Sequence, residues 1–263
     1  MWWTKKIEYF YDGFCTLGQL QKVPKLNEHH KLQIACGLNG TDYIDKEAIR
    51  EWIKDNITYP LYHLDFETVQ YAIPQYEGTH PYQQIPFQYS LHIEPAQDAA
   101  CKHREFLADA NSTSPMRQLA EQLCKDIPAD KCVLVYNQKF EKGRLAEMAA
   151  AFPDLHDHLM AIHDNIVDLL VPFQKWYYYR PAMNGSFSIK KVLPALFPND
   201  PTLDYHNLLG TVHNGGEAMD IFPRMRTMSG KDLEYARHSL LVYCELDTWS
   251  MVVILRKLYQ VSK

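Results

Sequence analysis

Two carboxylates stand two residues apart in an otherwise apolar stretch of this 263-residue chain. Asp65 and Glu67 interrupt residues 61–69, and on a β-strand residues two apart point to the same face. Neighbouring carboxylates repel each other and are costly to remove from water unless a cation lies between them. A hard divalent ion such as Mg²⁺ or Mn²⁺ binds such oxygen ligands. The alternative is a solvated strand end with two ordinary surface acids.

A third acid follows a second apolar run. Residues 131–136 are continuously apolar after Lys131 and fit a strand that is buried on both faces. Asn137, Gln138 and Lys139 then lead to Glu141 at the start of the next expected helix. The helix dipole also favours an acid in a first turn, so this position has a structural explanation as well.

A fourth acid and a tyrosine share one face of the last expected helix, residues 231–259. Tyr243 and Asp247 are four residues apart, on the face that also carries Leu240 and Met251. An acid on an apolar helical stripe needs a paired group or a metal ion. A buried aspartate that caps a neighbouring element is the alternative.

The remaining patterns predict the elements that must position these residues. Alternation and apolar runs predict strands, and helical spacing with capping signals predicts helices. Strands followed by strands that alternate with helices indicate an α/β domain around a mixed sheet. The expected strands are residues 61–69, 85–93, 101–106 and 131–136, and the expected helices are residues 45–54, 115–125, 140–151, 188–196 and 231–259.

Length and composition indicate one main domain, residues 58–263, preceded by an extension of residues 1–57 that packs on it. Hydrophobic residues make up 46% and charged residues 22%, as in a globular protein. We find no apolar run of about 18 residues, no signal peptide and no CxxC pair among six cysteines. We therefore expect a cytoplasmic protein with free thiols and no membrane association. The oligomeric state stays open.

The formal net charge of −5 argues against a broad surface that coats nucleic acid. It does not argue against an enzyme that holds a few nucleotides in a metal-lined cleft, because bound metals neutralise some of these carboxylates.

Together the acids resemble the motifs of the DEDD (DnaQ-like) 3′–5′ exonuclease superfamily. The matching residues are Leu64-Asp65-Phe66-Glu67-Thr68, Asn137 with Glu141, and Tyr243 with Asp247, the last pair being typical of the tyrosine subclass. The second motif usually ends in Asp, whereas this chain has Glu141. Residues 58–260 resemble more specifically a bacterial domain family of unknown function that its motifs place among these exonucleases. Members often carry a further upstream nuclease region, of which we see no motif here.

This resemblance implies a ribonuclease H-like α/β fold with a mixed central sheet of about five strands flanked by helices. It also implies two-metal hydrolysis of phosphodiester bonds in single-stranded DNA or RNA, with two Mg²⁺ or Mn²⁺ ions. Asp65 is expected to bridge both ions, Glu67 and Asp247 to complete one site, and Glu141 to act through the outer shell or the second ion. Tyr243 is expected to position the attacking water.

Substrate contacts are expected from Thr68, Asn137 and Lys139 beside the motifs, and from Tyr177 and Lys190. The last two lie in a segment that interleaves aromatic and basic residues, on which bases can stack. An aromatic core edge with solvated lysines explains that segment as well.

Two further readings stay open. One is a binding module of the same fold that has lost catalysis because Glu141 does not support the second metal. The other is a related activity, either a small-oligonucleotide phosphodiesterase or a structure-specific endonuclease. Nothing in the sequence distinguishes DNA from RNA.

Overall fold

The computed structural model describes residues 3–263, and these divide into two compact units. The first unit comprises residues 3–53, 170–198 and 258–263, and the second comprises residues 54–169 and 199–257. This division differs from a terminal extension followed by one domain, because two later segments group with the N-terminal residues.

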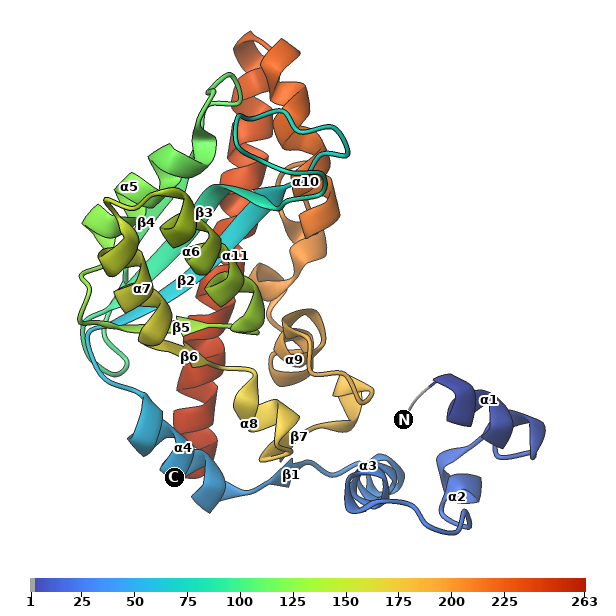
Figure 1. Ribbon diagram of the computed structural model, residues 1–263. Coiled ribbons are helices and arrows are strands. Elements are labelled where there is room, and N and C mark those ends of the chain that lie inside the picture. The colour runs from blue at the N-terminus through green and yellow to red at the C-terminus, as the bar shows by residue number, and fades with distance from the viewer. Residues whose placement is uncertain (1–2) are drawn as a thin grey trace. The chain divides into compact units, whose positions relative to one another are not determined.

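The second unit is built around a five-stranded mixed sheet, as expected for an α/β domain (Figure 1). The strand order is β4-β3-β2-β5-β6. The central strand β2 pairs antiparallel with β3 and parallel with β5. The strands are β2 (Leu61–Val69), β3 (Ile85–Glu94), β4 (Lys102–Leu107), β5 (Cys132–Val135) and β6 (Ile166–Asp168).

The central strand β2 is buried along its whole length except at Asp65, which is half-buried. Apolar residues on both of its faces explain why it occupies the middle of the sheet. Its pairing with β3 shifts register between Glu67 and Thr68, directly after the second carboxylate. Such bulges re-aim side chains at the ends of pairing and are frequent beside active sites.

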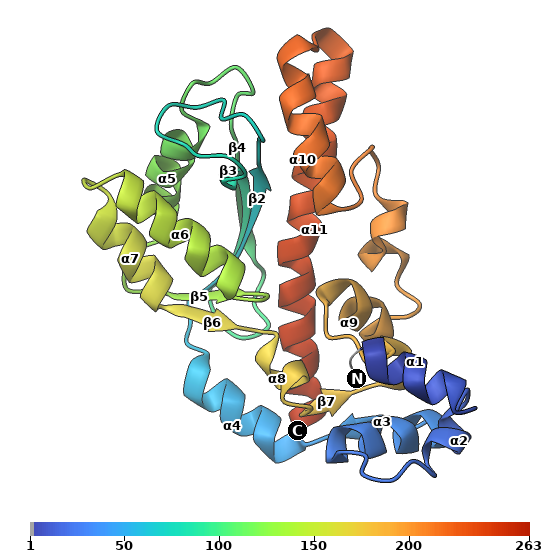
Figure 2. The same ribbon diagram turned by 45° about the vertical axis from the view of Figure 1, so that its right-hand side comes forward.

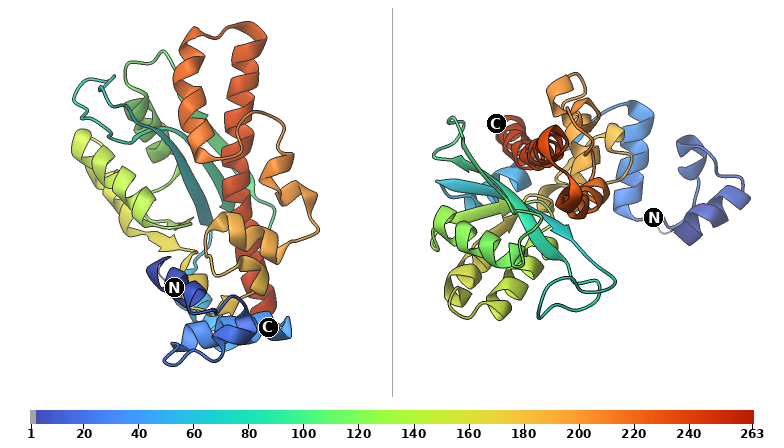
Figure 3. Two further views of the ribbon diagram at one scale, coloured as in Figure 1. Left: turned by 90° about the vertical axis from the view of Figure 1, so that its right-hand side faces the viewer. Right: turned by 90° about the horizontal axis from the view of Figure 1, so that it is seen from above.

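Helices cover both faces of this sheet. Figure 2 and the left view of Figure 3 show α5, α6 and α7 on one face and α10 with α11 on the other. Pro115 begins α5 at a first helical position, where its missing N–H costs nothing. These helices are α5 (Pro115–Asp126), α6 (Lys139–Ala151), α7 (His156–Asp164), α10 (Gly215–Arg224) and α11 (Gly230–Ser262). Short 3₁₀ turns occur at Pro201–Leu203, Tyr205–Asn207 and Met225–Thr227.

The 33-residue helix α11 is the longest in the described chain, and its residues belong to both units. It is long and apolar enough to cross a bilayer by length and composition alone. However, 67% of its most apolar window is buried inside the protein, which is what the core helix of a globular domain also shows. The apolar stripe therefore has an explanation in packing against the sheet.

The first unit is mostly helical, with one small sheet in which β1 pairs antiparallel with β7. The side chain of Asp45 accepts a hydrogen bond from the Ala48 N–H, so it caps α4. The elements are α1 (Trp3–Tyr11), α2 (Leu17–Leu20), α3 (Glu28–Asn39), β1 (Tyr43–Ile44), α4 (Lys46–Asn56), α8 (Val171–Gln174), β7 (Tyr178–Tyr179), a 3₁₀ turn (Pro181–Met183) and α9 (Ile189–Leu196).

Candidate metal centre

The two carboxylates of β2 lie together beside helix α11. Three potential ligand atoms lie within 4.8 Å of one another, one each from Asp65, Glu67 and Cys244. The Cys244 thiol points at the Asp65 carbonyl, with Sγ 3.8 Å from that oxygen. Burial and three nearby carboxylates raise the pKa of this thiol well above its ordinary value, so it remains protonated at neutral pH. The carboxylate oxygens, rather than a thiolate, are therefore the ligands that this corner offers to a cation.

Glu67 also lies close to the start of α10. A Cβ atom placed on Gly215, the first residue of α10, would lie 3.8 Å from Glu67 Oε2. The N-terminus of a helix carries partial positive charge and stabilises a nearby carboxylate. This contact offsets part of the cost of burying the Glu67 carboxylate.

Helix α11 brings Tyr243 and Asp247 to the same place. Both side chains are buried. The pKa of the Tyr243 hydroxyl is raised by burial and then by the charges of Asp247, Glu67 and Asp65. All three acids thus lie within electrostatic range of the tyrosine. A neutral phenol in this position can donate or accept a hydrogen bond but cannot act as a base near neutral pH.

Asp247 is held by a residue from a distant loop. The Tyr205 hydroxyl donates a 2.6 Å hydrogen bond to Asp247 Oδ1. The rings of Tyr205 and Tyr243 lie 5.9 Å apart and are tilted by 55°. One oxygen of Asp247 is thus oriented by a hydrogen bond, which fixes the direction in which the carboxylate presents itself.

Glu141 is the most deeply buried acid of the group. Only 2% of its surface is exposed, and its Oε2 atom has no hydrogen-bond partner among the described residues. Burial, together with the charges of Asp168 and Asp247, raises the pKa of Glu141 to about 8 against the opposing effects of a backbone hydrogen bond and Arg144. A buried carboxyl with an unsatisfied oxygen is costly unless a ligand completes its environment.

Asp168, at the end of β6, stabilises the turn between β5 and α6, the helix that carries Glu141. Its two carboxylate oxygens accept hydrogen bonds from the backbone N–H groups of Asn137 and Gln138, at 2.9 and 3.1 Å. Asn137 adopts a left-handed conformation with φ of 75°, which asparagine tolerates better than most residues. Asp168 therefore stabilises the β5–α6 turn, so that α6 begins where it can place Glu141 near the other acids.

The other residues expected to contact substrate lie in different surroundings. Thr68 is buried, and its hydroxyl lies 3.5 Å from Gln84 Oε1, an oxygen that also accepts a hydrogen bond from Arg144. Asn137 and Lys139 are exposed at the β5–α6 turn, where they can reach a bound molecule. Tyr177 and Lys190 are half-buried and belong to the first unit, whereas the carboxylates belong to the second.

Sequence reasoning did not identify Asp168 and Tyr205. Asp168 ends a three-residue strand within a mixed segment, and only its place after Ile166 and Val167 hints at a strand end. Tyr205 lies in a 3₁₀ turn of a loop-rich region, and no pattern connects it with Asp247.

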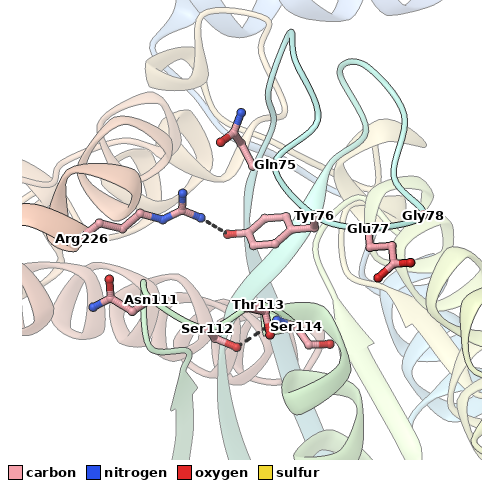
Figure 4. Close-up of a pocket in the computed structure, with 9 residues that line it drawn as sticks. All are labelled: Gln75, Tyr76, Glu77, Gly78, Asn111, Ser112, Thr113, Ser114 and Arg226. Atoms are coloured by element: carbon pink, nitrogen blue, oxygen red, sulfur yellow. Dashed lines mark hydrogen bonds between the residues drawn. The ribbon is translucent and has the colours of Figure 1, made fainter.

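The loop after β2 contributes to a polar cavity of about 800 Å³ (Figure 4). The Arg226 guanidinium donates a 3.1 Å hydrogen bond to the Tyr76 hydroxyl and also binds the Ala110 carbonyl. Serine, threonine and asparagine side chains of the segment before α5 form another wall. The lining residues are Gln75, Tyr76, Glu77, Gly78, Asn111, Ser112, Thr113, Ser114 and Arg226.

Comparison with known proteins identifies a domain but no activity. A family model described as "Domain of unknown function (DUF2779)" matches residues 62–188. That match includes Asp65, Glu67 and Glu141 and ends before Tyr243. No solved structure matches the chain.

Two curated bacterial proteins are similar to this chain. The uncharacterized protein MG366 of Mycoplasma genitalium is 26% identical over 207 residues, which is 73% of this chain and 31% of that protein. The uncharacterized protein UU173 of Ureaplasma parvum is 29% identical over 213 residues, which is 73% of this chain and 30% of that protein. The chain thus spans less than a third of the length of these relatives.

Proposed function

We propose that this protein is a metal-dependent nuclease that hydrolyses phosphodiester bonds of single-stranded nucleic acid from the 3′ end. The observation that carries the proposal is a set of four acids: Asp65 and Glu67 lie within reach of one shared cation, and Asp247 and Glu141 lie within electrostatic range. Three of them come from a central strand and a long helix, and the fourth is Glu141, whose buried Oε2 has no hydrogen-bond partner in the described part of the chain. A divalent cation would satisfy that oxygen and offset the repulsion among the carboxylates.

The donor set fits Mg²⁺ or Mn²⁺ because it consists of carboxylate oxygens, the ligands these hard ions prefer. Asp65, Glu67 and Asp247 would hold the ions, and Glu141 would complete the second ion or its outer shell. When bound, such ions activate a water molecule and stabilise the leaving oxygen of a phosphodiester.

The protein's own groups have separate tasks in this reaction. Tyr243 would orient the attacking water through a hydrogen bond, because an unassisted phenol with a pKa of about 10 is a poor base at neutral pH. Tyr205 fixes Asp247, and Asp168 fixes the turn that precedes Glu141. Preorganised groups of this kind stabilise the charge that develops in the transition state without moving during the reaction.

The superfamily resemblance supports the 3′–5′ direction and a ribonuclease H-like arrangement of the sheet. The mixed order β4-β3-β2-β5-β6, with the first acids on the central strand, is compatible with that arrangement. The loop after β2 supplies a surface for a substrate strand. It exposes Ile73 and Tyr82 and forms the polar cavity with Arg226, which can contact a phosphate.

The test is degradation of 5′-labelled single-stranded DNA and RNA of equal sequence, with Mg²⁺, Mn²⁺ or EDTA. The proposal predicts a metal-dependent ladder that shortens from the 3′ end and is absent in Asp65→Ala. Internal cuts indicate an endonuclease, action only on the shortest oligonucleotides indicates a phosphodiesterase for small products, and binding without cleavage indicates a non-catalytic module. Each of these three results contradicts the exonuclease proposal.

A further inference from the structure

A second group of metal-ligating side chains lies on α11 and on the neighbouring strands β3 and β4. His92 of β3 and His103 of β4 are direct cross-strand partners, and their ring centroids are 4.6 Å apart. Glu245 of α11 lies beside them, with Oε1 3.8 Å from His103 Nδ1. Each of the three residues offers a ligand atom within 4.8 Å of the other two. This cluster shares no residue with the carboxylate centre.

The hydrogen bonds around Thr248 are consistent with one assignment of the protons on the histidines. In this assignment the Thr248 hydroxyl donates to the Glu245 carbonyl at 3.1 Å. Thr248 Oγ1 must then accept its two other contacts, which are His92 Nδ1 at 2.8 Å and Ser90 Oγ at 2.7 Å. His92 therefore carries its proton on Nδ1, and its Nε2 lone pair is available.

The same reasoning extends to the second ring. Ser90 donates its proton to Thr248, so it accepts the 2.9 Å hydrogen bond from His103 Nε2. His103 is therefore protonated on Nε2 in its neutral form, and its Nδ1 atom presents a lone pair. That lone pair faces the Glu245 carboxylate, which is also an acceptor. In this tautomer His103 Nδ1 and Glu245 Oε1 are two hydrogen-bond acceptors that face each other without a proton between them. A cation between these two atoms would be stabilised by both.

We propose that His92, His103 and Glu245 bind a borderline transition-metal ion of the Zn²⁺ class. Two imidazole nitrogens and one carboxylate suit Zn²⁺, Co²⁺ or Ni²⁺, whereas Mg²⁺ prefers oxygen ligands alone. The Ser90–Thr248 chain acts as the outer shell that holds both rings in the required tautomers. A water molecule would complete a tetrahedral site with three protein ligands.

The three ligand atoms must move closer together to bind one ion. Ligand atoms around a tetrahedral Zn²⁺ ion at about 2.0–2.1 Å lie roughly 3.3 Å apart. The present spacing of up to 4.8 Å closes by side-chain movement, since the side chain of Glu245 is 48% exposed and that of His103 is 24% exposed. His92, which is buried, provides the fixed ligand.

The position of this site suggests its role. Glu245 lies two residues from both Tyr243 and Asp247, on the same helix. A metal ion that links Glu245 to β3 and β4 would fix the segment of α11 that carries those two residues. The ion would thus stabilise the carboxylate centre from outside without contacting a substrate.

Cobalt binding to the full chain tests this inference without reference to activity. After removal of metals with a chelator, the protein is titrated with Co²⁺, whose visible absorption is intense in a tetrahedral nitrogen site and weak in an octahedral oxygen site. We expect one equivalent to give the intense band. Glu245→Gln should weaken this binding at least about tenfold, as loss of a ligand or outer-shell partner does, and His103→Ala should abolish the band.

Two controls keep the result specific. Glu234→Gln makes the same change at an exposed position of α11 outside the cluster and should leave the band and the affinity unchanged. Asp65→Asn alters the other centre and should also leave the band intact. A wild-type protein without the intense band overturns the proposal. So does a band that survives in both Glu245→Gln and His103→Ala, or one that disappears in Asp65→Asn. Circular dichroism confirms that each variant is folded, and Glu245→Gln is expected to fold because the residue is exposed.

Discussion

Tyr205 and Asp247 are joined by a 2.6 Å hydrogen bond although 42 residues separate them in the sequence. The tyrosine comes from a 3₁₀ turn of a long loop, and the aspartate comes from the long C-terminal helix. The contact orients one carboxylate oxygen of the candidate metal centre. It also makes the loop part of the site, which no sequence motif indicates.

Replacing Tyr205 with Phe should slow metal-dependent cleavage while the fold is retained. A hydrogen bond to a charged group contributes about 1.5–3 kcal/mol, so a rate decrease of roughly tenfold or more is expected. The measurement is the initial rate of strand degradation over a range of Mn²⁺ concentrations. Tyr235→Phe serves as the matched control, since Tyr235 is exposed on α11. Equal rates in wild type and Tyr205→Phe would show that the contact does not position Asp247.

Glu141→Gln should separate stability from activity. Because the folded pKa of Glu141 is raised to about 8 from an ordinary value of 4.5, the folded protein favours the neutral carboxyl. The contribution of the neutral carboxyl to folding stability is fully present below pH 4.5 and is lost as the pH rises through about 8. In a chelator, wild type should therefore lose thermal stability relative to Glu141→Gln over this range.

The same variant should lose most of its response to metal ions. Mn²⁺ should raise the melting temperature of wild type more than that of Glu141→Gln, because the ion favours the ionised carboxylate. Activity should fall in the variant even where its stability is higher. If the melting temperatures of the two proteins in chelator vary with pH in parallel, Glu141 does not have the raised pKa that its burial implies, and the proposed role as a metal ligand is contradicted.

A separate buried charge pair supports the sheet beneath the site. Arg256 donates two hydrogen bonds to Glu94 Oε1, at 3.0 and 2.7 Å, and the Glu94 carboxylate is buried. Burial favours the neutral carboxyl, but His63 and Arg256 outweigh this effect, and the pKa of Glu94 is lowered. The stability that this pair contributes is present above the ordinary pKa of 4.5 and is lost as the pH falls through the lowered value.

Arg256→Met should accordingly reduce the free energy of unfolding by about 3–5 kcal/mol near neutral pH, because it leaves a buried charge unpaired. Chemical denaturation measures the change, with Lys231→Met on the exposed part of α11 as the control. The double replacement Arg256→Met with Glu94→Gln should recover much of the loss. A single variant as stable as the control would show that Glu94 is not held as a charged group.

Much of the sheet was predictable because its strands carry strong local signals. The apolar run around Asp65 predicts β2, and alternation after Phe87 predicts β3 as its antiparallel partner; both predictions are confirmed. The expected helices at 115–125, 140–151 and 231–259 are also confirmed within a few residues. The spacing of the acids predicts that Asp65 shares a face with Glu67 and that Tyr243 shares a face with Asp247, since strand and helix periodicity determine which side chains share a face.

The rest depends on tertiary contacts that local patterns do not encode. Asp168 acts through the backbone of a turn that precedes another helix, and Tyr205 acts from an irregular loop. Helix α10 lies beside β2 and brings Gly215 to Glu67, but nothing in its sequence, which begins with two glycines and contains Pro223, indicates which strand it packs against. The grouping of residues 170–198 with the N-terminal segment likewise follows from packing rather than from composition.

The most direct test of the central claim is the rate of mononucleotide release from a single-stranded oligonucleotide with Mn²⁺, compared between wild type and Asp65→Asn. Asn keeps the shape of the side chain but removes the charge that an ion requires. Asp55→Asn, at an exposed position, is the matched control. The account predicts metal-dependent release by wild type and Asp55→Asn, and a loss of at least about a thousandfold in Asp65→Asn. The account is contradicted if nucleotide release persists in Asp65→Asn, or if a folded wild-type protein releases no nucleotide with Mn²⁺.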